Sequence, residues 1–282
     1  MKMERIFTRP VEKIIEKRKS VRTYEERALE EKDKKRIHAY METLSNPFGK
    51  EVRFSFLEIK DNRKVLGTYG IIKGTVDYIG AAIKDEPLSL EALGYELEKL
   101  ILFCQDLGIG TCWLGGTFKR EDFRSAMEIS PEDLFPAVTP VGYPKDAKSM
   151  ADNLVRFIAK GNMRKPFGEL FFSGDFQHPL LEEEAGVHKR VLEMVRLAPS
   201  ASNKQPWRIL LKDDQYHFYL AKTPRYSDAF AYDIQRIDLG IAACHFQLSA
   251  EEKGLPGSFA VLEDPRIEAP ENTMYCFSWV SH

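Results

Sequence analysis

The sequence lacks a surplus of either charge. Its 282 residues include 41 Lys and Arg against 43 Asp and Glu, which gives a net charge of −2. Proteins that bind nucleic acid normally carry a basic surplus, so this balance argues against a nucleic-acid partner. The sequence also lacks an apolar run long enough to span a membrane, and its N-terminus, MKMERIFTRP, has no signal-peptide core. We therefore expect a cytoplasmic protein with no membrane partner.

Cysteine is scarce, and the four cysteines follow no recognised spacing. Cys104, Cys112, Cys244 and Cys276 contain no C-x-x-C pair and no zinc-finger pattern. Each lies in an apolar or aromatic neighbourhood, where a reduced and buried thiol is the common outcome. The sequence thus predicts structural cysteines.

Several chemical signatures are also missing. The six histidines form no H-x-x-x-H or H-E-x-x-H arrangement, so we expect no metal site. No G-x-S-x-G elbow supports a hydrolase triad, and neither a P-loop nor a dinucleotide-binding G-x-G-x-x-G is present. These absences exclude the commonest signatures of hydrolases and nucleotide-binding enzymes.

The hydrophobic patterning that is present predicts a mixture of helices and strands. Helices are expected over 11–18, 29–44, 187–197 and 234–253, and a further one runs from an N-cap at Ser89 to a stop at Gly108. Strands are expected over 52–59, 78–83, 136–143, 207–211, 217–221 and 274–280, with a hairpin turn at Asp213 and Asp214. The order has no regular βαβ rhythm, which favours an α+β fold over a doubly wound sheet.

The two longest helices indicate an internal duplication. Gly94 precedes Gly108 by 14 positions, and Gly240 precedes Gly254 by the same interval. The helices are offset by 146 positions and the preceding strands by 153, so one half carries a small insertion. A chance match of two helix-loop-strand units is the alternative. Duplication predicts two halves, 1–165 and 166–282, that form an internal pseudo-dimer with a pseudo-twofold axis in a monomeric chain.

A basic run, Arg18-Lys19-Ser20-Val21-Arg22, follows the first predicted helix. If the chain is extended there, Arg18, Ser20 and Arg22 project to the same side. Two guanidinium groups and a hydroxyl on one face suit a phosphate monoester. A solvated basic patch is the alternative.

A polar loop, Ala198–Trp207, joins a predicted helix to a predicted strand. Its two serines, asparagine and glutamine lie between prolines, and they offer donors that suit a planar polar ring or a ribityl chain. A rigid turn with Trp207 as a core anchor is the alternative. Gly108–Gly116 is a second candidate, because its glycines let the backbone approach a flat ligand closely.

Together these segments resemble the FMN-dependent nitroreductase family. Its hallmarks are an R-[RK]-S-x-R run, an A-P-S-x-x-N-x-Q-P-W loop and a long central helix that ends in G-[LI]-G. A glycine-rich turn, a Gly-Tyr-Pro strand end and a basic pair follow in the family, and this sequence has Trp113–Gly116, Gly142-Tyr143-Pro144 and Arg164-Lys165-Pro166. The resemblance implies a nitroreductase-like fold.

The order of the motifs departs from that family. The A-P-S loop lies in the second half, whereas the position expected for it holds Ser45–Lys50, and the second half has no counterpart of the basic run. Family members are dimers in which each flavin contacts both subunits. The division therefore implies the duplicated, single-chain branch of the family, with one complete flavin site and one lost.

The resemblance also implies roles for individual residues. The FMN phosphate and ribityl chain would be held by Arg18, Lys19, Ser20, Arg22, Arg164 and Lys165, and approached from the other half by Pro199, Ser200, Ser202 and Asn203. The isoalloxazine ring would be lined by Trp113, Leu114, Gly115 and Gly116, with Tyr69 and Gly70 at its pyrimidine side. No side chain is assigned as a catalytic acid or base.

The implied reaction is ping-pong transfer of reducing equivalents from NAD(P)H through FMN to a nitroaromatic, a quinone or a similar small acceptor. Two alternatives stay open. One is reductive dehalogenation or flavin breakdown on the same fold, and the other is a flavin-binding or regulatory protein without turnover.

Overall fold

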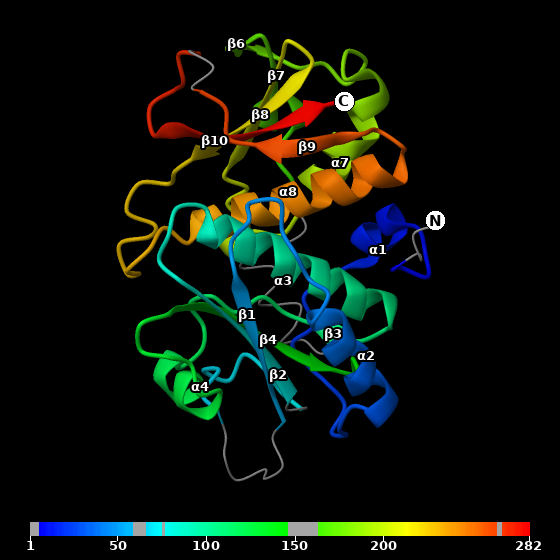
Figure 1. Cartoon of the computed structure of the whole chain (residues 1–282), viewed down its shortest axis with the longest axis vertical. Coiled ribbons are helices and arrows are strands. Elements are labelled where there is room, and N and C mark those ends of the chain that lie inside the picture. The colour runs from blue at the N-terminus through cyan, green and yellow to red at the C-terminus, as the bar shows by residue number, and fades with distance from the viewer. Residues whose placement is uncertain (1–5, 59–65, 75–76, 146–162, 264–266) are drawn as a thin grey trace. The chain divides into compact units, whose positions relative to one another are not determined.

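The computed structural model describes residues 6–58, 66–74, 77–145, 163–263 and 267–282 (Figure 1). Its contacts divide the chain into two units. Unit 1 comprises Met1–Ser45, Lys50–Ser89 and Glu96–Ile158, and unit 2 comprises Asn46–Gly49, Leu90–Tyr95 and Ala159–His282. The boundary between duplicated halves at residues 165 and 166 stays a prediction, since these units are defined by contacts and not by duplication.

Unit 1 contains a four-stranded antiparallel sheet in the order β1-β2-β4-β3. The strands are β1 (Val52–Leu57), β2 (Asp77–Ile83), β3 (Gly110–Thr111) and β4 (Leu134–Gly142). The predicted strands over 52–59, 78–83 and 136–143 are thus confirmed, although Ile59 lies outside the described residues. Every residue of β2 is buried, which explains its unbroken apolar run.

Four helices in the described residues belong wholly or partly to unit 1. They are α1 (Val11–Lys17), α2 (Glu31–Met41), α3 (Ser89–Asp106) and α4 (Arg120–Ala126). The first three confirm the predicted helices. The sequence patterning did not predict α4, because this short helix buries a single side chain, Phe123, and so shows no apolar stripe.

The C-terminal end of α3 was predicted correctly, and its N-terminal end was not. Ser89 was predicted as the N-cap, but Leu88 holds that position with a φ of 68°, and Ser89 is the first helical residue. The Ser89 N–H instead donates to the Glu86 carbonyl at 3.1 Å, which closes a turn before the helix. The predicted stop at Gly108 is confirmed, because this glycine takes a φ of 78° just beyond the last turn.

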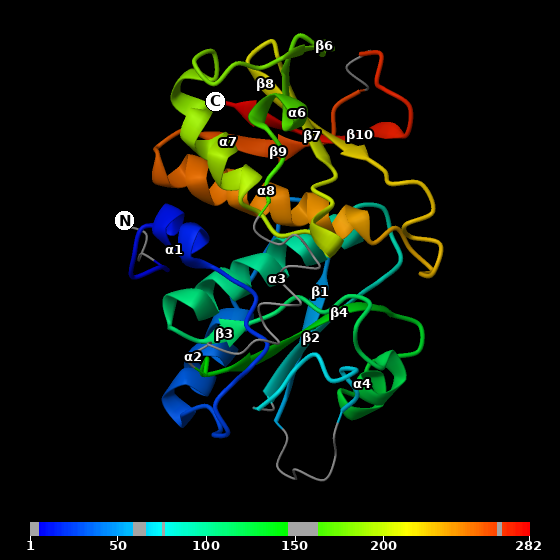
Figure 2. The same cartoon turned by 180° about the vertical axis from the view of Figure 1, so that it is seen from behind.

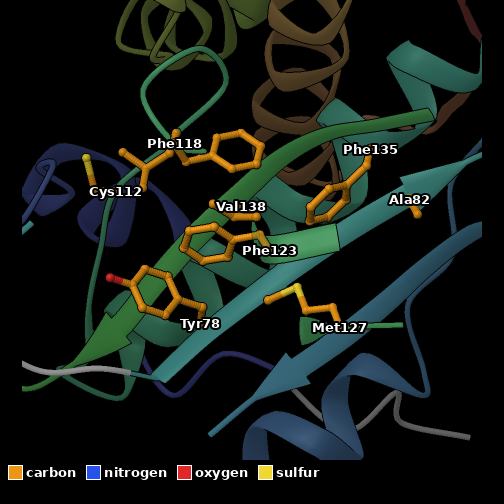
Figure 3. Packing of buried hydrophobic residues seen from close by; sticks show 9 residues of the cluster. Tyr78, Ala82, Cys112, Phe118, Phe123, Met127, Phe135 and Val138 are labelled. Carbon is orange, nitrogen blue, oxygen red and sulfur yellow. The ribbon is translucent and has the colours of Figure 1, made fainter. Parts of the chain in front are cut away.

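An aromatic cluster forms the core beside this sheet (Figure 3). Phe118 and Phe135 meet edge to face with ring centroids 5.7 Å apart, and Phe123 meets Tyr78 in the same way at 4.9 Å. Such edge-to-face pairs add to the stabilisation from burial alone. The buried members are Tyr78, Ala82, Cys112, Leu114, Phe118, Phe123, Met127, Phe135 and Val138, and Leu66 and Ile72 pack at the edge.

Unit 2 contains a six-stranded sheet in the order β6-β5-β7-β8-β10-β9. The strands are β5 (Phe171–Ser173), β6 (Asp175–Pro179), β7 (Trp207–Lys212), β8 (Gln215–Ala221), β9 (Gly257–Ala260) and β10 (Thr273–Ser281). The predicted hairpin is confirmed: Asp213 and Asp214 have φ values of 51° and 56°, as a type I′ turn requires. Among the described strands only β5 and β7 pair in parallel.

The helices of unit 2 are α6 (Phe167–Leu170), α7 (Lys189–Arg196) and α8 (Gln235–Glu252), with 3₁₀ turns at Gly186–His188 and Ala201–Asn203. The two longer helices confirm those predicted over 187–197 and 234–253. α7 packs on α8, which also contacts β7 and β8 (Figure 2). Largely antiparallel sheets accompanied by helices confirm the α+β class. No helix in the described segments is long and apolar enough to cross a membrane.

All four cysteines are buried and free of disulfides, which confirms the prediction of structural thiols. Burial raises the pKa of the Cys104 thiol to about 12, and burial likewise raises that of Cys276 to about 12. Neither thiol is reactive under physiological conditions, because the thiolate is the nucleophilic form.

The N-terminal part of α3 crosses α8 in backbone contact. A Cβ on Gly94 would lie 2.1 Å from the Ile237 carbonyl oxygen, and a Cβ on Gly240 would lie 1.9 Å from that of Glu91. Both glycines therefore have no room for a side chain. They are the two glycines that the predicted duplication makes equivalent, and such a reciprocal contact is what a twofold relation produces.

Candidate functional site

The guanidinium of Arg18 is buried and not solvated. The backbone turns extended at Arg18, immediately after α1. Its side chain is only 7% exposed, and its Nε lies 3.8 Å from Oε1 of Glu98, a wholly buried residue of α3. Nη1 of Arg18 is buried and has no hydrogen-bond partner in the described part of the chain. For Arg18 the alternative of a solvated basic patch is therefore wrong.

The rest of the basic run is extended, as the sequence predicted. Ser20 forms a parallel bridge with Thr111 of β3, and the Val21 N–H donates to the Thr111 carbonyl at 2.8 Å. Val21 is buried and Lys19 is exposed, whereas Ser20 and Arg22 are half-buried. The shared side for Arg18, Ser20 and Arg22 stays a prediction, because Lys19 and Val21 differ in burial although they alternate with these residues.

The glycine-rich turn follows β3, and Trp113 begins it. Its half-buried indole donates from Nε1 to Oε2 of Glu98 at 2.7 Å. The Gly115 carbonyl accepts from Nη2 of Arg120 at 2.8 Å. Within the described residues the N–H groups of Gly115 and Gly116 form no hydrogen bond, so both can donate to a ligand.

Leu114 does not fit the role implied for it. Its side chain is 1% exposed and belongs to the aromatic cluster. Its N–H and carbonyl exchange hydrogen bonds of 3.0 Å with Val138. The placement of Leu114 against a flavin ring is thus corrected, because the residue has no exposed side-chain surface and its backbone groups are already paired.

Tyr69 and Gly70 form the tip of a tight turn. Both have positive φ values, 51° and 74°, and the Ile71 N–H donates to the Thr68 carbonyl at 3.0 Å. The ring of Tyr69 is 66% exposed. Because Leu66 and Ile72 pack on the aromatic cluster that also holds Leu114, this turn and the glycine-rich turn share one anchor. A contact with flavin stays a prediction for Tyr69 and Gly70.

The Ala198–Trp207 loop of unit 2 is held by its own polar side chains. The Gln205 N–H donates to Oγ of Ser200 at 2.9 Å, and the Tyr226 hydroxyl donates to Oγ of Ser202 at 2.8 Å. Ser202, Asn203 and Gln205 all have φ near 50°, a region that L residues rarely adopt. The polar side chains therefore maintain a strained backbone, while the hydroxyl hydrogens of both serines remain able to donate.

The structure brings Arg164 and Lys165 to this loop. Nη1 of Arg164 donates to Oδ1 of Asn203 at 3.2 Å, and Nη2 donates to the Leu197 carbonyl at 3.2 Å. The Lys165 N–H donates to Oε1 of Gln205 at 2.9 Å. Two motifs that lie about 40 residues apart in the sequence thus form one cluster. Pro199 is half-buried beside it, and Trp207 is fully buried, as the core-anchor interpretation expected.

Positive charge accumulates around Lys165. Burial lowers the pKa of Lys165, and the neighbouring Arg208 and Lys204 lower it further, in spite of Glu169. Burial also lowers the pKa of Arg208. Cations that oppose one another in this way are stabilised when an anion binds among them. We call Arg164, Lys165, Lys204 and Arg208 the cationic cluster.

Two buried acids, one in each unit, contact candidate site residues and were not predicted from the sequence. Asp238 of α8 accepts the Ala201 N–H at 2.9 Å beneath the polar loop, and Glu98 of α3 contacts Arg18 and Trp113. The available signal was that α3 and α8 carry acidic residues among nearly continuous apolar ones. A buried carboxylate requires a partner, but the sequence does not show which residue supplies it.

The described residues contain no cluster of His, Cys, Asp and Glu able to hold a metal ion. The donors found instead are the Arg18 guanidinium and the N–H groups of Gly115 and Gly116 in unit 1, and guanidinium, ammonium and hydroxyl groups at the Ala198–Trp207 loop in unit 2. Such a set binds a phosphorylated, hydrogen-bonding organic ligand rather than a cation.

A family model described as "Putative TM nitroreductase" matches residues 10–250. The chain belongs to this nitroreductase family and is therefore an oxidoreductase by class. It is 27% identical over 161 residues to a protein from Archaeoglobus fulgidus named "Putative NADH dehydrogenase/NAD(P)H nitroreductase". That alignment covers 51% of this chain and 91% of the relative, so nearly half of this chain has no counterpart in it.

A solved structure confirms the nitroreductase-like fold. The crystal structure of a "putative nitroreductase" from Thermotoga maritima superposes with a TM-score of 0.62 at 21% sequence identity. The superposition covers 96% of this chain and 93% of the Thermotoga maritima chain. A Bacteroides fragilis nitroreductase whose structure contains bound FMN is 15% identical, with a TM-score of 0.40. That match covers 51% of this chain and 92% of the Bacteroides fragilis chain.

Proposed function

We propose that the chain is an FMN-dependent oxidoreductase that passes reducing equivalents from NAD(P)H to a small acceptor such as a nitroaromatic or a quinone. Membership of the nitroreductase family supplies the reaction class. The observation that supports FMN most directly is the cationic cluster, locked onto the Ala198–Trp207 loop by Arg164 and Lys165. A phosphate monoester supplies the anion that this cluster favours.

The residues present fit the chemical groups of FMN. In unit 2, Lys165 and Arg164 would bind the phosphate, and the hydroxyls of Ser200 and Ser202 would donate to ribityl or ring oxygens. In unit 1, the buried Nη1 of Arg18 requires an acceptor. These assignments, together with Lys19, Ser20, Arg22, Pro199 and Asn203, come from the resemblance and are proposals.

FMN, when bound, supplies the hydride chemistry, and the protein supplies binding and orientation. The unpaired N–H groups of Gly115 and Gly116 would donate to an acceptor at the edge of the ring system, and the indole of Trp113 would line its surface. Tyr69, at an exposed turn, would cover part of the ring. No side chain is assigned as a catalytic acid or base.

The second half of the chain has an aromatic cluster at the position equivalent to the glycine-rich turn. Phe259 lies 146 positions after Trp113, the offset that relates the two long helices. The ring of Phe48, from the degenerate Ser45–Lys50 segment, lies 6.0 Å from that of Phe259 and 4.9 Å from that of Phe277. Packed rings leave no room for a flavin there, so we propose one FMN per chain.

We expect the purified chain to bind FMN in a ratio of one per polypeptide. Absorbance of the released flavin against protein concentration gives the ratio, and NAD(P)H oxidation with a panel of nitroaromatics and quinones tests turnover. A colourless protein that takes up no FMN would contradict the cofactor, and a ratio of two would contradict the single site. Bound FMN without turnover would favour a flavin-binding protein.

Lys165→Met should weaken FMN binding about tenfold or more, because a charge-assisted hydrogen bond is worth about 1.5–3 kcal/mol. The same substitution should weaken the binding of riboflavin, which lacks the phosphate, by less than threefold. Flavin fluorescence titration measures both dissociation constants. Lys189→Met is the control, because Lys189 pairs with Glu182 on the surface of the same unit. Equal losses for FMN and riboflavin would place the phosphate elsewhere.

A further inference from the structure

Glu98 joins two residues that the proposed function assigns to the flavin. Its side chain is wholly buried on α3, and no sequence motif includes it. One carboxylate oxygen, Oε2, accepts the indole N–H of Trp113 at 2.7 Å. The other, Oε1, lies 3.8 Å from Nε of Arg18. One carboxylate therefore fixes an arginine from the basic run and an indole from the glycine-rich turn.

The burial of Arg18 explains why a carboxylate is needed at this place. A guanidinium with 7% of its side chain exposed has lost most of its hydration, and an opposite charge offsets that loss. Glu98 lies on a helix that is buried along its length, so its own position is well defined. Arg18 follows the short helix α1 and has several rotatable bonds, so it gains the most order from the pair.

The pair leaves part of Arg18 available. Nη1 is buried and has no hydrogen-bond partner within the described residues, whereas Nε lies 3.8 Å from Oε1 of Glu98. Because the charge of Arg18 is balanced by Glu98, this arginine acts as a directed donor more than as a free cation.

We propose that Glu98 is a positioning residue of the flavin site, which holds Arg18 and Trp113 in the orientation in which they meet the cofactor. The inference rests on the proposed function. Glu98 itself does not touch FMN, and it acts through its two partners. A binding site whose donors are held in place before the ligand arrives spends less of its interaction energy on ordering them.

A double-mutant cycle on FMN affinity tests this role. Glu98→Gln should raise the dissociation constant about tenfold, and Arg18→Met should raise it by about tenfold to a hundredfold. The double variant should bind no more weakly than Arg18→Met alone, because the glutamine oxygen still accepts the Trp113 indole N–H, so Glu98→Gln acts mainly through Arg18. Additive losses, or wild-type affinity in Glu98→Gln, would overturn the proposal.

Glu91→Gln is the matched control. Glu91 lies on the same helix, is equally buried and pairs with an arginine, Arg236, at 2.5 Å, but it contacts none of the proposed flavin residues. Its FMN dissociation constant should stay within twofold of wild type. If Glu98→Gln loses the fold by circular dichroism, Glu98→Asp keeps the charge but shortens the reach, and it should raise the constant at least threefold. An unchanged constant in Glu98→Asp would overturn the proposal.

The failure of this inference is distinct from failure of the proposed function. If the wild-type chain binds no FMN, the proposed function fails, while coupling between Glu98 and Arg18 is still measurable in the unfolding of the flavin-free protein. If the wild-type chain binds FMN and Glu98→Gln binds it equally well, only the positioning role fails.

Discussion

Gly240→Ala should destabilise the protein by about 3 kcal/mol, at the upper end of the usual range for overpacking. The new Cβ would lie 1.9 Å from the Glu91 carbonyl oxygen, and a backbone atom cannot move aside by changing rotamer. In an unobstructed helix the same substitution would stabilise by about 1 kcal/mol, because alanine is the better helix former. The sign of the change in unfolding free energy therefore reports the contact directly.

Urea denaturation followed by circular dichroism gives this free energy, and Gly94→Ala should behave in the same way. Gly254→Ala is the control, since it follows the same helix and has a φ of 68° with no atom within 4 Å of a new Cβ. It should cost only about 1 kcal/mol of backbone strain. A Gly240→Ala protein as stable as wild type would show that the two helices do not touch.

Asp238→Asn should become more stable than wild type as the pH rises. Burial raises the pKa of Asp238 well above its ordinary value, Asp233 adds to this effect, and the hydrogen bond from the Ala201 N–H opposes it. The folded chain thus keeps a proton that the unfolded chain loses. Stability falls as pH rises above about 3.9, the unfolded pKa, and stops falling above the folded pKa. Asparagine keeps the acceptor for Ala201 and cannot ionise.

Unfolding free energies of both proteins between pH 4 and pH 8 test this expectation. The two unfolding free energies should be similar near pH 4. At pH 8 that of the variant should be higher by more than about 1 kcal/mol, which is the order of the cost of an unmatched buried polar group. Asp228→Asn, at an exposed aspartate, should leave the profile of wild type unchanged. Parallel profiles for wild type and Asp238→Asn would mean that Asp238 is ionised in the folded chain.

Periodic apolar patterns predicted the longer elements of the fold. α3 and α8 have continuous stripes, and the β7–β8 hairpin has a turn dipeptide that tolerates positive φ. The short elements α4, β3, β5, β6, α6 and β9 were not predicted, because a few residues cannot show a period. The predicted N-cap of α3, Ser89, was wrong by one position, because cap preferences do not favour Leu88 in a left-handed conformation.

The candidate site was predictable where a motif is local in sequence. The basic run, the polar loop and the glycine-rich turn were all identified from their own residues. Pairings across the chain were not, because nothing in the sequence shows that Arg164 meets Asn203 or that Glu98 meets Arg18. Leu114 was misassigned for a related reason: its position between Trp113 and Gly115 suggested a shared surface, yet its side chain is buried in the core.

The reciprocal glycine contact has a genetic consequence. In a symmetric homodimer one codon specifies both glycines at such a crossing, and any substitution occurs twice. In a single chain Gly94 and Gly240 are separate codons, so selection must preserve each of them independently. The same independence leaves the equivalent loops free to differ, and Ser45–Lys50 carries Phe48 whereas Ala198–Trp207 is polar. One polypeptide can thus keep a symmetric framework and specialise only one of its two ends.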